Sequence, residues 1–306
     1  MQTDDAYDPP CSNAAAPPEE IDSLPQPASG LVLVSTPIGN LGDITIRALD
    51  TLRHADLVLC EDTRTTAKLL SAHSIGVRCE PLHDHNEDHR IPGLLERLRK
   101  GAKIALVSDA GTPLVSDPGF RLVRACIAEG IKVTATPGAN AALLALTLSG
   151  LPPHPFLFLG FAPNRDAARR TNFAGLRAAE QAGLAATMIW YEAPHRLAEM
   201  LADLATIFGA REAAVARELT KRFEEIRRDT LPALADYYAT HQARGEIVVL
   251  IGPGAVETGS DADIDRLLMV ALESMSVKDA ANAVAAVTGT TKKAVYARAL
   301  KIRQEA

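Results

Sequence analysis

The stretch from Ile104 to Val123 constrains the fold of this chain more than any other segment. It begins with the apolar run Ile104–Val107, which is short enough to be a buried strand. A loop rich in Gly, Pro, Asp and Ser follows from Ser108 to Gly119, and Phe120–Ile127 has the spacing of an amphipathic helix. A strand, an irregular loop and a helix form the unit whose loop lies at the carboxyl edge of a parallel sheet, where ligands of open α/β folds bind.

The loop Ser108–Gly119 has residues that suit a binding loop. Asp109 can accept hydrogen bonds from an amine or a hydroxyl, and the small residues Ala110 and Gly111 let a ligand approach the backbone. An ordinary surface turn would have a similar composition. The loop therefore needs support from other strand ends.

That support comes from three further short apolar segments between residues 30 and 152. Each of them is followed by a loop of Gly, Pro or small polar residues and then by a helical pattern: Leu31–Val34, Leu57–Cys60 and Lys132–Thr136. These four segments belong to a series of five predicted strands that alternate with helices, so we expect a parallel doubly wound α/β domain with a binding cleft. The loop after the first strand lacks both G-x-G-x-x-G and the Walker lysine, which disfavours a dinucleotide or a nucleoside triphosphate.

Two polar segments in this region are candidates for chemistry. Asp62 and Arg64 follow a predicted strand and can orient a polar substrate, or Asp62 can simply cap the next helix. His83, His85 and His89 stand beside carboxylates, a combination that suits zinc or manganese. No cysteine and no His-x-x-x-His pair elsewhere in the chain completes a metal site with these histidines. We therefore predict that this segment contacts substrate or is a solvated loop, and that it binds no metal.

Length and composition indicate a multidomain globular protein. A chain of 306 residues suits two domains, and its 47% apolar content is enough for proper cores. No apolar run approaches the roughly 20 residues of a membrane span. The four cysteines show no paired spacing, which fits a reducing, cytoplasmic compartment. We expect a disordered acidic tail at 1–29, α/β domains at 30–152 and 153–258, and a helical unit at 259–306.

The charge of the chain is concentrated in its tail. Residues 1–29 contain six Asp or Glu and no Lys or Arg, so 38 − 6 = 32 acids remain against 32 bases. The folded part is therefore electrically balanced. Any nucleic acid must bind to local basic patches.

The second domain is expected to be a mixed α/β domain. Its predicted strands are Phe156–Phe161, Ala186–Tyr191, Glu212–Leu219 and Gly245–Ile251. Glu192 and His195 follow one of them and invite an acid–base interpretation, although a histidine at a helix start is often structural. A basic concentration follows another, and a salt-bridged surface explains it equally well; it comprises Arg217, Lys221, Arg222, Arg227 and Arg228.

The C-terminal segment resembles a helix-turn-helix. Helical patterns cover Leu267–Ser274, Ser276–Val287 and Thr291–Arg303, with a Gly turn before the last. The last helix has five basic residues and no acid, which suits phosphate contacts: Lys292, Lys293, Arg298, Lys301 and Arg303. A packing or dimerisation role is the alternative.

The loops taken together resemble a known family. They are Thr36-Pro-Ile-Gly-Asn-Leu-Gly-Asp43, Glu61-Asp-Thr-Arg64, Ser108-Asp-Ala-Gly-Thr-Pro-Leu-Val-Ser-Asp-Pro-Gly119, Thr136-Pro-Gly-Ala-Asn-Ala141, Tyr191-Glu-Ala-Pro-His-Arg196 and Arg217-Glu-Leu-Thr-Lys221. In this order they are similar to the tetrapyrrole-methylase superfamily and, within it, to the ribosomal RNA small subunit methyltransferase I family. The resemblance covers about 30–303 and implies a two-domain tetrapyrrole-methylase-like fold.

This resemblance implies a homodimeric enzyme that binds S-adenosyl-L-methionine between its domains. The implied reaction transfers a methyl group to the ribose 2′-oxygen of a cytidine in the decoding region of 16S rRNA, free or in the 30S subunit. By position, the implied cofactor contacts are Ile38, Asp109, Thr112, Asn140, Ala141, Tyr191, Leu219 and Gly245. Ala110 and Gly111 belong to the same loop and join this set.

A ribose hydroxyl is a weak nucleophile, so a proton acceptor or a nearby cation should assist its methylation. We expect Asp62 and Arg64 first in these roles, with Glu192 and His195 as further candidates. The predicted RNA contacts are Lys221, Arg222, Lys292, Lys293 and Arg298.

Two rival functions fit parts of the pattern. One keeps the fold but methylates a tetrapyrrole; the basic C-terminal unit and the Glu61–Arg64 loop argue against it. The other is a ribosome-assembly factor that binds rRNA without catalysis, and it predicts no affinity for the methyl donor.

Overall fold

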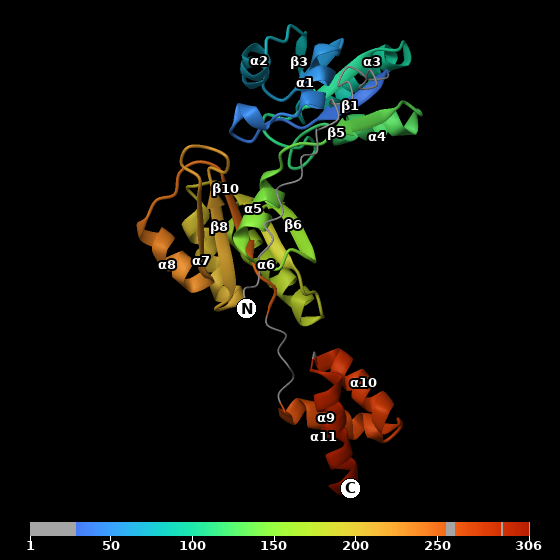
Figure 1. Cartoon of the computed structure of the whole chain (residues 1–306), viewed down its shortest axis with the longest axis vertical. Helices are drawn as coiled ribbons and strands as arrows, with labels where there is room; N and C mark the ends of the chain where they lie inside the picture. The colour runs from blue at the N-terminus through green and yellow to red at the C-terminus, as the bar shows by residue number, and fades with distance from the viewer. Residues whose placement is uncertain (1–28, 255–260, 289, 306) are drawn as a thin grey trace, which may run out of the picture. The chain divides into compact units, whose positions relative to one another are not determined.

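The computed structural model describes residues 29–254, 261–288 and 290–305 (Figure 1). The chain divides into two compact units. The first ends at Ala139 and includes the described residues before it except Ile38–Asn40, which belong with the second unit and Asn140 onward. The predicted acidic tail lies, up to residue 28, outside the described residues. Within the described part, no helix is both long and apolar enough to cross a membrane.

The first unit has a five-stranded sheet in which every pairing is parallel. The strand order is β3-β2-β4-β1-β5. The strands are β1 (Gly30–Val34), β2 (Leu57–Cys60), β3 (Cys79–Pro81), β4 (Lys103–Val107) and β5 (Val133–Thr136). Since β1 and β4 are neighbours although β2 and β3 separate them in the chain, the loops that follow β1 and β4 leave the same edge of the sheet side by side.

Helices cover both faces of this sheet, as expected from the nearly continuous apolar runs of β1, β2 and β4. The helices of this unit are the 3-10 helix η2 (Leu41–Asp43) and the α-helices α1 (Ile46–Arg53), α2 (Thr63–Ala72), α3 (Glu87–Arg99) and α4 (Phe120–Ala128). Val32 and Ala105 pack with α1 and α2, whereas Leu31 and Ile104 pack with α3 and α4. The predicted doubly wound domain is confirmed.

The second unit has a mixed sheet in the order β6-β7-β10-β8-β9, in which only β6 and β7 are parallel. Its elements are α5 (Ala141–Ser149), β6 (Phe156–Phe161), α6 (Asp166–Gln181), β7 (Thr187–Glu192), α7 (Leu197–Phe208), β8 (Glu212–Arg217), β9 (Glu225–Thr230), α8 (Leu231–Thr240) and β10 (Ile247–Ile251). Helices α6, α7 and α8 bury Trp190, Val215 and Val249 on one face, and α5 packs against β8 and β10. This confirms the mixed α/β prediction.

Strand β9 was not predicted, and β8 ends two residues earlier than expected. The chain turns at Glu218 and Thr220, whose φ angles are 50° and 64°, and Glu225–Thr230 then pairs antiparallel with β8. This strand is short of apolar residues and lies at the sheet edge, where charged side chains hinder pairing with another chain. Hydrophobic periodicity alone could not reveal it.

The C-terminal segment forms three helices around a small core of its own. They are α9 (Asp261–Leu272), α10 (Val277–Thr288) and α11 (Lys292–Glu305). Ser276 caps α10, because its Oγ accepts a hydrogen bond from the backbone N–H of Asp279 at 3.2 Å. The predicted helical unit is thus present, with its first helix beginning six residues earlier than predicted.

Candidate functional site

Hydrogen bonds join the loops that follow β1 and β4. Thr36 and Gly111 exchange two backbone hydrogen bonds, with N–O distances of 2.9 and 3.1 Å. The Thr36 hydroxyl also donates to the carbonyl of Ser108 at 3.2 Å, and the Ser108 hydroxyl donates to the carbonyl of Gly111 at 3.0 Å. These buried bonds fix the backbone around Asp109 and Ala110, two of the predicted ligand contacts.

The loops after β2 and β5 join the same cluster. Asp109 Oδ1 accepts a hydrogen bond from the backbone N–H of Asp62 at 3.0 Å, and Thr112 donates to the carbonyl of Ala139 at 3.1 Å. Four strand ends therefore converge on the segment Ser108–Thr112, where the doubly wound topology leads one to expect a ligand.

The loop after β4 is held in an unfavourable backbone conformation. Leu114 and Ser116 have φ angles of 71° and 68°, in the left-handed region that costs ordinary residues energy. The structure describes five such non-glycine residues, and the turn after β8 holds two more of them, Glu218 and Thr220. Because strain of this kind concentrates at functional sites, both loops are candidates for ligand contact.

Three carboxyl groups influence one another at this sheet edge. Burial, followed by the nearby charges of Glu61 and Asp109, raises the pKa of Asp117 to about 7. The pKa of Glu61 is also raised, first by burial and then by Asp109. Asp117 was not among the predicted site residues. Its position in Ser116-Asp-Pro-Gly119, just before α4, was the available signal.

Asp62 and Arg64 form the exposed end of this edge. Asp62 caps α2 by accepting from the backbone N–H of Arg64 at 2.8 Å, and its carboxylate is held by the Arg64 guanidinium at 2.6 Å. The hydrogen bond from Arg64 holds the pKa of Asp62 at about 2. The cap alternative is therefore confirmed. Such an acidic carboxyl group is a weak proton acceptor.

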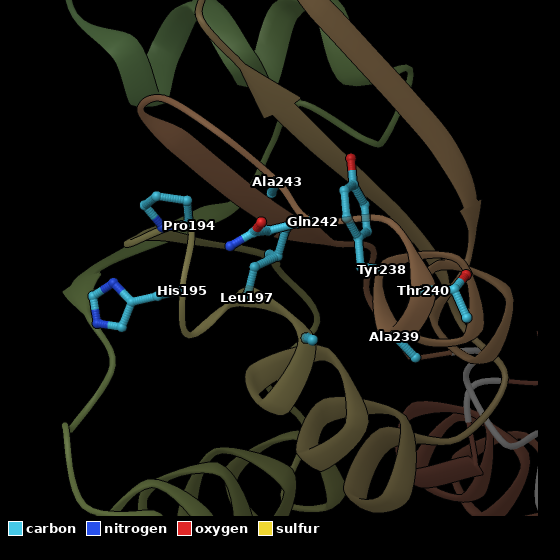
Figure 2. A pocket seen from close by; sticks show the side chains of 9 residues that line it. Pro194, His195, Leu197, Tyr238, Ala239, Thr240, Gln242 and Ala243 are labelled. Atoms are coloured by element: carbon cyan, nitrogen blue, oxygen red, sulfur yellow. The ribbon is translucent and has the colours of Figure 1, made fainter.

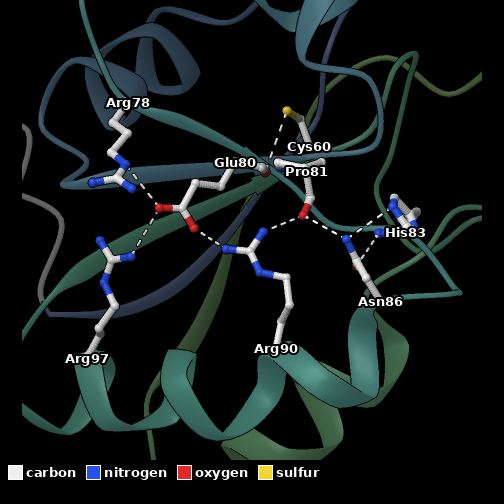
Figure 3. Close-up of polar contacts among 8 residues, drawn as sticks. All are labelled: Cys60, Arg78, Glu80, Pro81, His83, Asn86, Arg90 and Arg97. Carbon is white, nitrogen blue, oxygen red and sulfur yellow. Dashed lines mark hydrogen bonds and ion pairs between the residues drawn. The ribbon is translucent and has the colours of Figure 1, made fainter.

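The histidine-rich segment is organised as a helix start (Figure 3). Asn86 accepts from the backbone N–H of His83 at 3.0 Å and lies 3.1 Å from His83 Nε2. Beside it, the Glu80 carboxylate is surrounded by the guanidinium groups of three arginines: Arg78, Arg90 and Arg97. Among the described residues, no three His, Cys, Asp or Glu side chains lie close enough together to bind a metal ion.

Another acid of that segment, Glu87, has a structural task that the sequence did not reveal. It is buried at the start of α3, and its Oε1 accepts a hydrogen bond from the backbone N–H of Leu122 at 2.8 Å. Leu122 lies in the first turn of α4, where backbone N–H groups lack partners within the helix. Glu87 thus fixes the helix that follows the strained loop.

In the second unit, the predicted site residues gather at one edge of the mixed sheet. The register places Glu192 beside Ile247, and Ile247 beside Arg217, so the end of β7, the start of β10 and the end of β8 coincide. Tyr191 is half-buried, with its ring edge-on to Phe158 and Phe161 at 4.9 and 5.7 Å.

Glu192 and His195 differ sharply in exposure. Glu192 is 2% exposed, and Oε1 accepts from the backbone N–H of Ala193 at 2.8 Å and lies 3.3 Å from Arg196. Burial raises its pKa. His195 is exposed and makes no hydrogen bond to a described residue. The two side chains of the predicted acid–base pair therefore occupy different environments.

The glycine at position 245, at this edge, has a clear local reason. Gly245 has a φ of 82°, and a Cβ placed on it would lie 2.3 Å from the carboxyl carbon of Glu218. Glu218 in turn accepts from the backbone N–H of Glu246 at 3.1 Å and pairs with Lys221 at 2.9 Å. Leu219 is buried beside this turn. The ligand roles of Gly245 and Leu219 stay predictions.

The other predicted cofactor positions of this unit are Ile38, Asn140 and Ala141. Ile38 is buried at 5% exposure. Asn140 is the N-cap of α5, and its Oδ1 accepts from the backbone N–H of Leu143 at 3.1 Å. Ala141 begins that helix.

Two of the five predicted RNA contacts, Lys221 and Arg298, are paired with acids, as is the neighbouring Arg217. Arg217 pairs with Glu225 at 2.6 Å and Lys221 with Glu246 at 3.0 Å. Arg298 of α11 is bound to Asp265 of α9. Arg222 instead lies 5.6 Å over the exposed ring of Phe223. Lys292 and Lys293 are exposed at the start of α11. The salt-bridged alternative thus holds for Arg217 and Lys221.

Comparisons with known proteins agree with the fold and extend to the C-terminal unit. Residues 30–235 match the family model for tetrapyrrole (corrin/porphyrin) methylases, and residues 258–303 match the model for the RsmI C-terminal HTH domain. A protein of Mesorhizobium japonicum named ribosomal RNA small subunit methyltransferase I is 49% identical, over 93% of this chain and 95% of its own length.

The chain belongs to the ribosomal RNA small subunit methyltransferase I family. The Pseudomonas aeruginosa member of this family is 43% identical over 90% of the chain and 98% of its own length. The chain is thus a methyltransferase of the tetrapyrrole-methylase superfamily, as the motifs predicted.

Solved structures with the same fold have more distant sequences. A diphthine synthase covers 72% of this chain and 89% of its own, with a TM-score of 0.56 and 16% identity. The methyltransferase CobJ covers 74% and 95%, with a TM-score of 0.54 and 20% identity. Both share the fold of this family with our chain.

Proposed function

We propose that this methyltransferase uses S-adenosyl-L-methionine to methylate the ribose 2′-oxygen of a cytidine in small-subunit rRNA. The observation that carries the proposal is the extent of the family match. It spans both α/β units and continues through the C-terminal helices, the last of which is basic. A tetrapyrrole methylase would have no evident use for that last unit, whereas an enzyme acting on RNA would.

The converging loops of the first unit suit the proposed donor. Asp109 offers acceptor atoms for an amine or a hydroxyl, and Ala110 is exposed beside it, which lets a ligand reach the backbone. The bound donor would supply a methyl group already activated by a positive sulfur. The residues we propose to hold it are Ile38, Asp109, Ala110, Gly111, Thr112, Asn140, Ala141, Tyr191, Leu219 and Gly245.

Little covalent chemistry remains for the protein when the methyl group is already activated. Its main tasks are to align donor and acceptor, to exclude water and to remove the hydroxyl proton. Rigid loops suit alignment, and the buried hydrogen bonds of Thr36 and Ser108 supply that rigidity.

We propose four side chains for the polar chemistry at the acceptor. Arg64 has 87% of its side chain exposed and can stabilise a developing alkoxide or a phosphate, with Asp62 orienting it. Glu192 has a raised pKa, as a proton acceptor near neutral pH requires. His195 is exposed and can contact substrate directly.

We propose that the substrate is 16S rRNA, either free or in the assembled 30S subunit. The residues we propose to contact it are Lys221, Arg222, Lys292, Lys293 and Arg298. Those with exposed cationic groups, Arg222, Lys292 and Lys293, are best able to reach phosphates. Lys221 and Arg298 already have acidic partners and would have to share them.

A homodimer is also proposed from the family resemblance. In support, α4 exposes Phe120 and Ile127 at 60% and 63%, two turns apart and therefore on one side of the helix. A sedimentation experiment on the purified chain would show a dimer if this proposal is right.

The proposal is tested by calorimetric titration of the purified chain with S-adenosyl-L-methionine. We expect micromolar binding that Asp109→Ala weakens at least tenfold, because this change removes a carboxylate from the converging loops. A chain that does not bind the donor would instead be a non-catalytic rRNA-binding factor, and the enzymatic proposal would be wrong.

A further inference from the structure

Two adjoining hollows lie in the second unit, apart from the residues assigned above to the donor. The larger one, of about 280 Å³, is formed by the start of α7 and the end of α8. Figure 2 shows its lining, with the Gln242 amide lying between Pro194 and the Tyr238 ring. The smaller one, of about 140 Å³, lies between β8, β9 and the segment after α8. They share Tyr238, Gln242 and Ala243.

We infer that these hollows form a nucleotide subsite for single-stranded RNA, with a base in the larger and a phosphate in the smaller. This inference rests on the proposed function, since it assigns a place to part of the substrate. A drug-sized ligand needs a pocket of roughly 300 Å³ or more. The larger hollow falls just below that size and therefore suits one planar ring better than a complete cofactor.

The lining of the larger hollow matches the surface of a nucleobase. Pro194 and Ala198, both half-buried, give apolar walls for a planar ring, and the buried side chains of Leu197 and Tyr238 lie behind them. Gln242 supplies one amide acceptor and two donors, and it makes no hydrogen bond to any described residue. Unstacked RNA bases are recognised in this way, by packing of their faces and hydrogen bonding of their edges.

The smaller hollow supplies positive charge. Arg244 is exposed and makes no ion pair with a described residue, and Arg217 lines the same space while paired with Glu225. An arginine without a carboxylate partner is well suited to a phosphate. An apolar peptide would not require this cation beside an amide.

The wall between the hollows is rigid. Tyr237 is stacked on His241 with the ring centroids 4.1 Å apart, and the Arg227 guanidinium lies 3.6 Å from the centroid of Tyr237. Tyr238 is 6% exposed and packs edge-on against Tyr237. A site built on such an aromatic stack loses little conformational entropy when a base enters.

The test is fluorescence anisotropy of a labelled single-stranded, cytidine-containing oligoribonucleotide with the full chain and no methyl donor. We expect Gln242→Ala to weaken binding about fivefold, as for loss of one hydrogen bond. Arg244→Ala should weaken it by a similar factor and reduce the slope of log affinity against log salt by about 0.7. Matched controls are Gln181→Ala, at the exposed end of α6, and Arg53→Ala in the first unit; both should change affinity less than twofold.

Three outcomes would overturn the inference. The oligonucleotide could fail to bind the wild-type chain, or the two hollow variants could bind like their controls. Alternatively, the variants could shift sedimentation from dimer to monomer without altering RNA affinity, which would make the hollows an interface between copies of the chain.

A failure of the proposed function would look different. It would show as an absence of donor binding in calorimetry or of label transfer to rRNA by the wild-type chain. The anisotropy experiment requires no reaction, so its result stands in either case. Thermal melting of each variant checks that the fold is intact.

Discussion

At the scale of single residues, the candidate site is an arrangement of carboxylates in contrasting environments. Asp62 has 30% of its side chain exposed and is paired with Arg64, which keeps its pKa at about 2. Asp117 is half-buried near Glu61 and Asp109, and its pKa is raised to about 7. The pKa values of these two aspartates at one sheet edge are therefore shifted in opposite directions from the ordinary value.

This contrast predicts opposite pH dependence for two variants. The folded-state pKa of Asp117 lies above its unfolded value, so its stabilising contribution is complete below about pH 4 and is lost as the pH rises through 7. The melting temperature of Asp117→Asn should therefore rise relative to that of the wild type as the pH is raised from 5 to 8.

Asp62→Asn is the matched control. The pKa of Asp62 is lowered, so its contribution is present above about pH 4 and lost as the pH falls towards 2. This variant should have a lower melting temperature than the wild type at pH 7, and the difference between the two melting temperatures should become smaller in acid. Parallel behaviour of the two variants in thermal melts from pH 3 to pH 8 would contradict the assignment.

At the scale of elements, helix α4 depends on a carboxylate from α3. Glu87→Ala removes the acceptor for the backbone N–H of Leu122 and leaves that group buried and unpaired. We expect a loss of about 1–3 kcal/mol in the free energy of unfolding. Glu87→Gln keeps an acceptor oxygen and should recover part of it in urea titrations. Equal stability of the Ala variant and wild type would contradict this role.

The turn after β8 makes a similar prediction for Gly245. An alanine there would have a left-handed backbone and would clash with the Glu218 carboxylate. Gly245→Ala should therefore lower the free energy of unfolding by at least about 2 kcal/mol. Gly130 has a comparable φ of 68° but open space around it. Gly130→Ala should cost only about 1 kcal/mol. If the two costs are equal in urea titrations, the close approach of Glu218 is unimportant.

Elements of this fold differ in how far the sequence predicted them. Strands β2 and β6 were predicted to the residue, because each is a short apolar run in the sequence. The charged edge strand β9 was missed for the opposite reason. Glu87 and Asp117 were missed because their environments depend on Leu122 and Glu61 respectively, which are distant from them in sequence.

At the scale of the whole molecule, three folded parts have separate tasks in the proposed function. The parallel sheet presents the donor loops, the mixed sheet presents Tyr191–Arg196 and the two hollows, and α9–α11 present a basic helix. The family resemblance of the motifs predicted the donor loops of the parallel sheet and the basic helix of the C-terminal unit. The hollows could not be foreseen, because they are formed by side chains of elements with no motif in common.

The basic helix gives a prediction at this scale. Lys292→Glu combined with Lys293→Glu should weaken RNA binding and reduce the salt slope by about 1.4, from two lost phosphate contacts. Affinity for the donor should stay unchanged in calorimetry. Unaltered RNA affinity would instead support the packing role for α9–α11.

The central claim is that the loops around Asp109 hold a methyl donor for transfer to an RNA sugar. It is tested most directly by incubating the full chain with small ribosomal subunits and methyl-labelled S-adenosyl-L-methionine, then mapping the labelled nucleotide. The account predicts label on the ribose 2′-oxygen of one cytidine in the rRNA, and none when Asp109→Ala replaces the wild type. Label on a base alone, on protein, or equal label with both enzymes would contradict it.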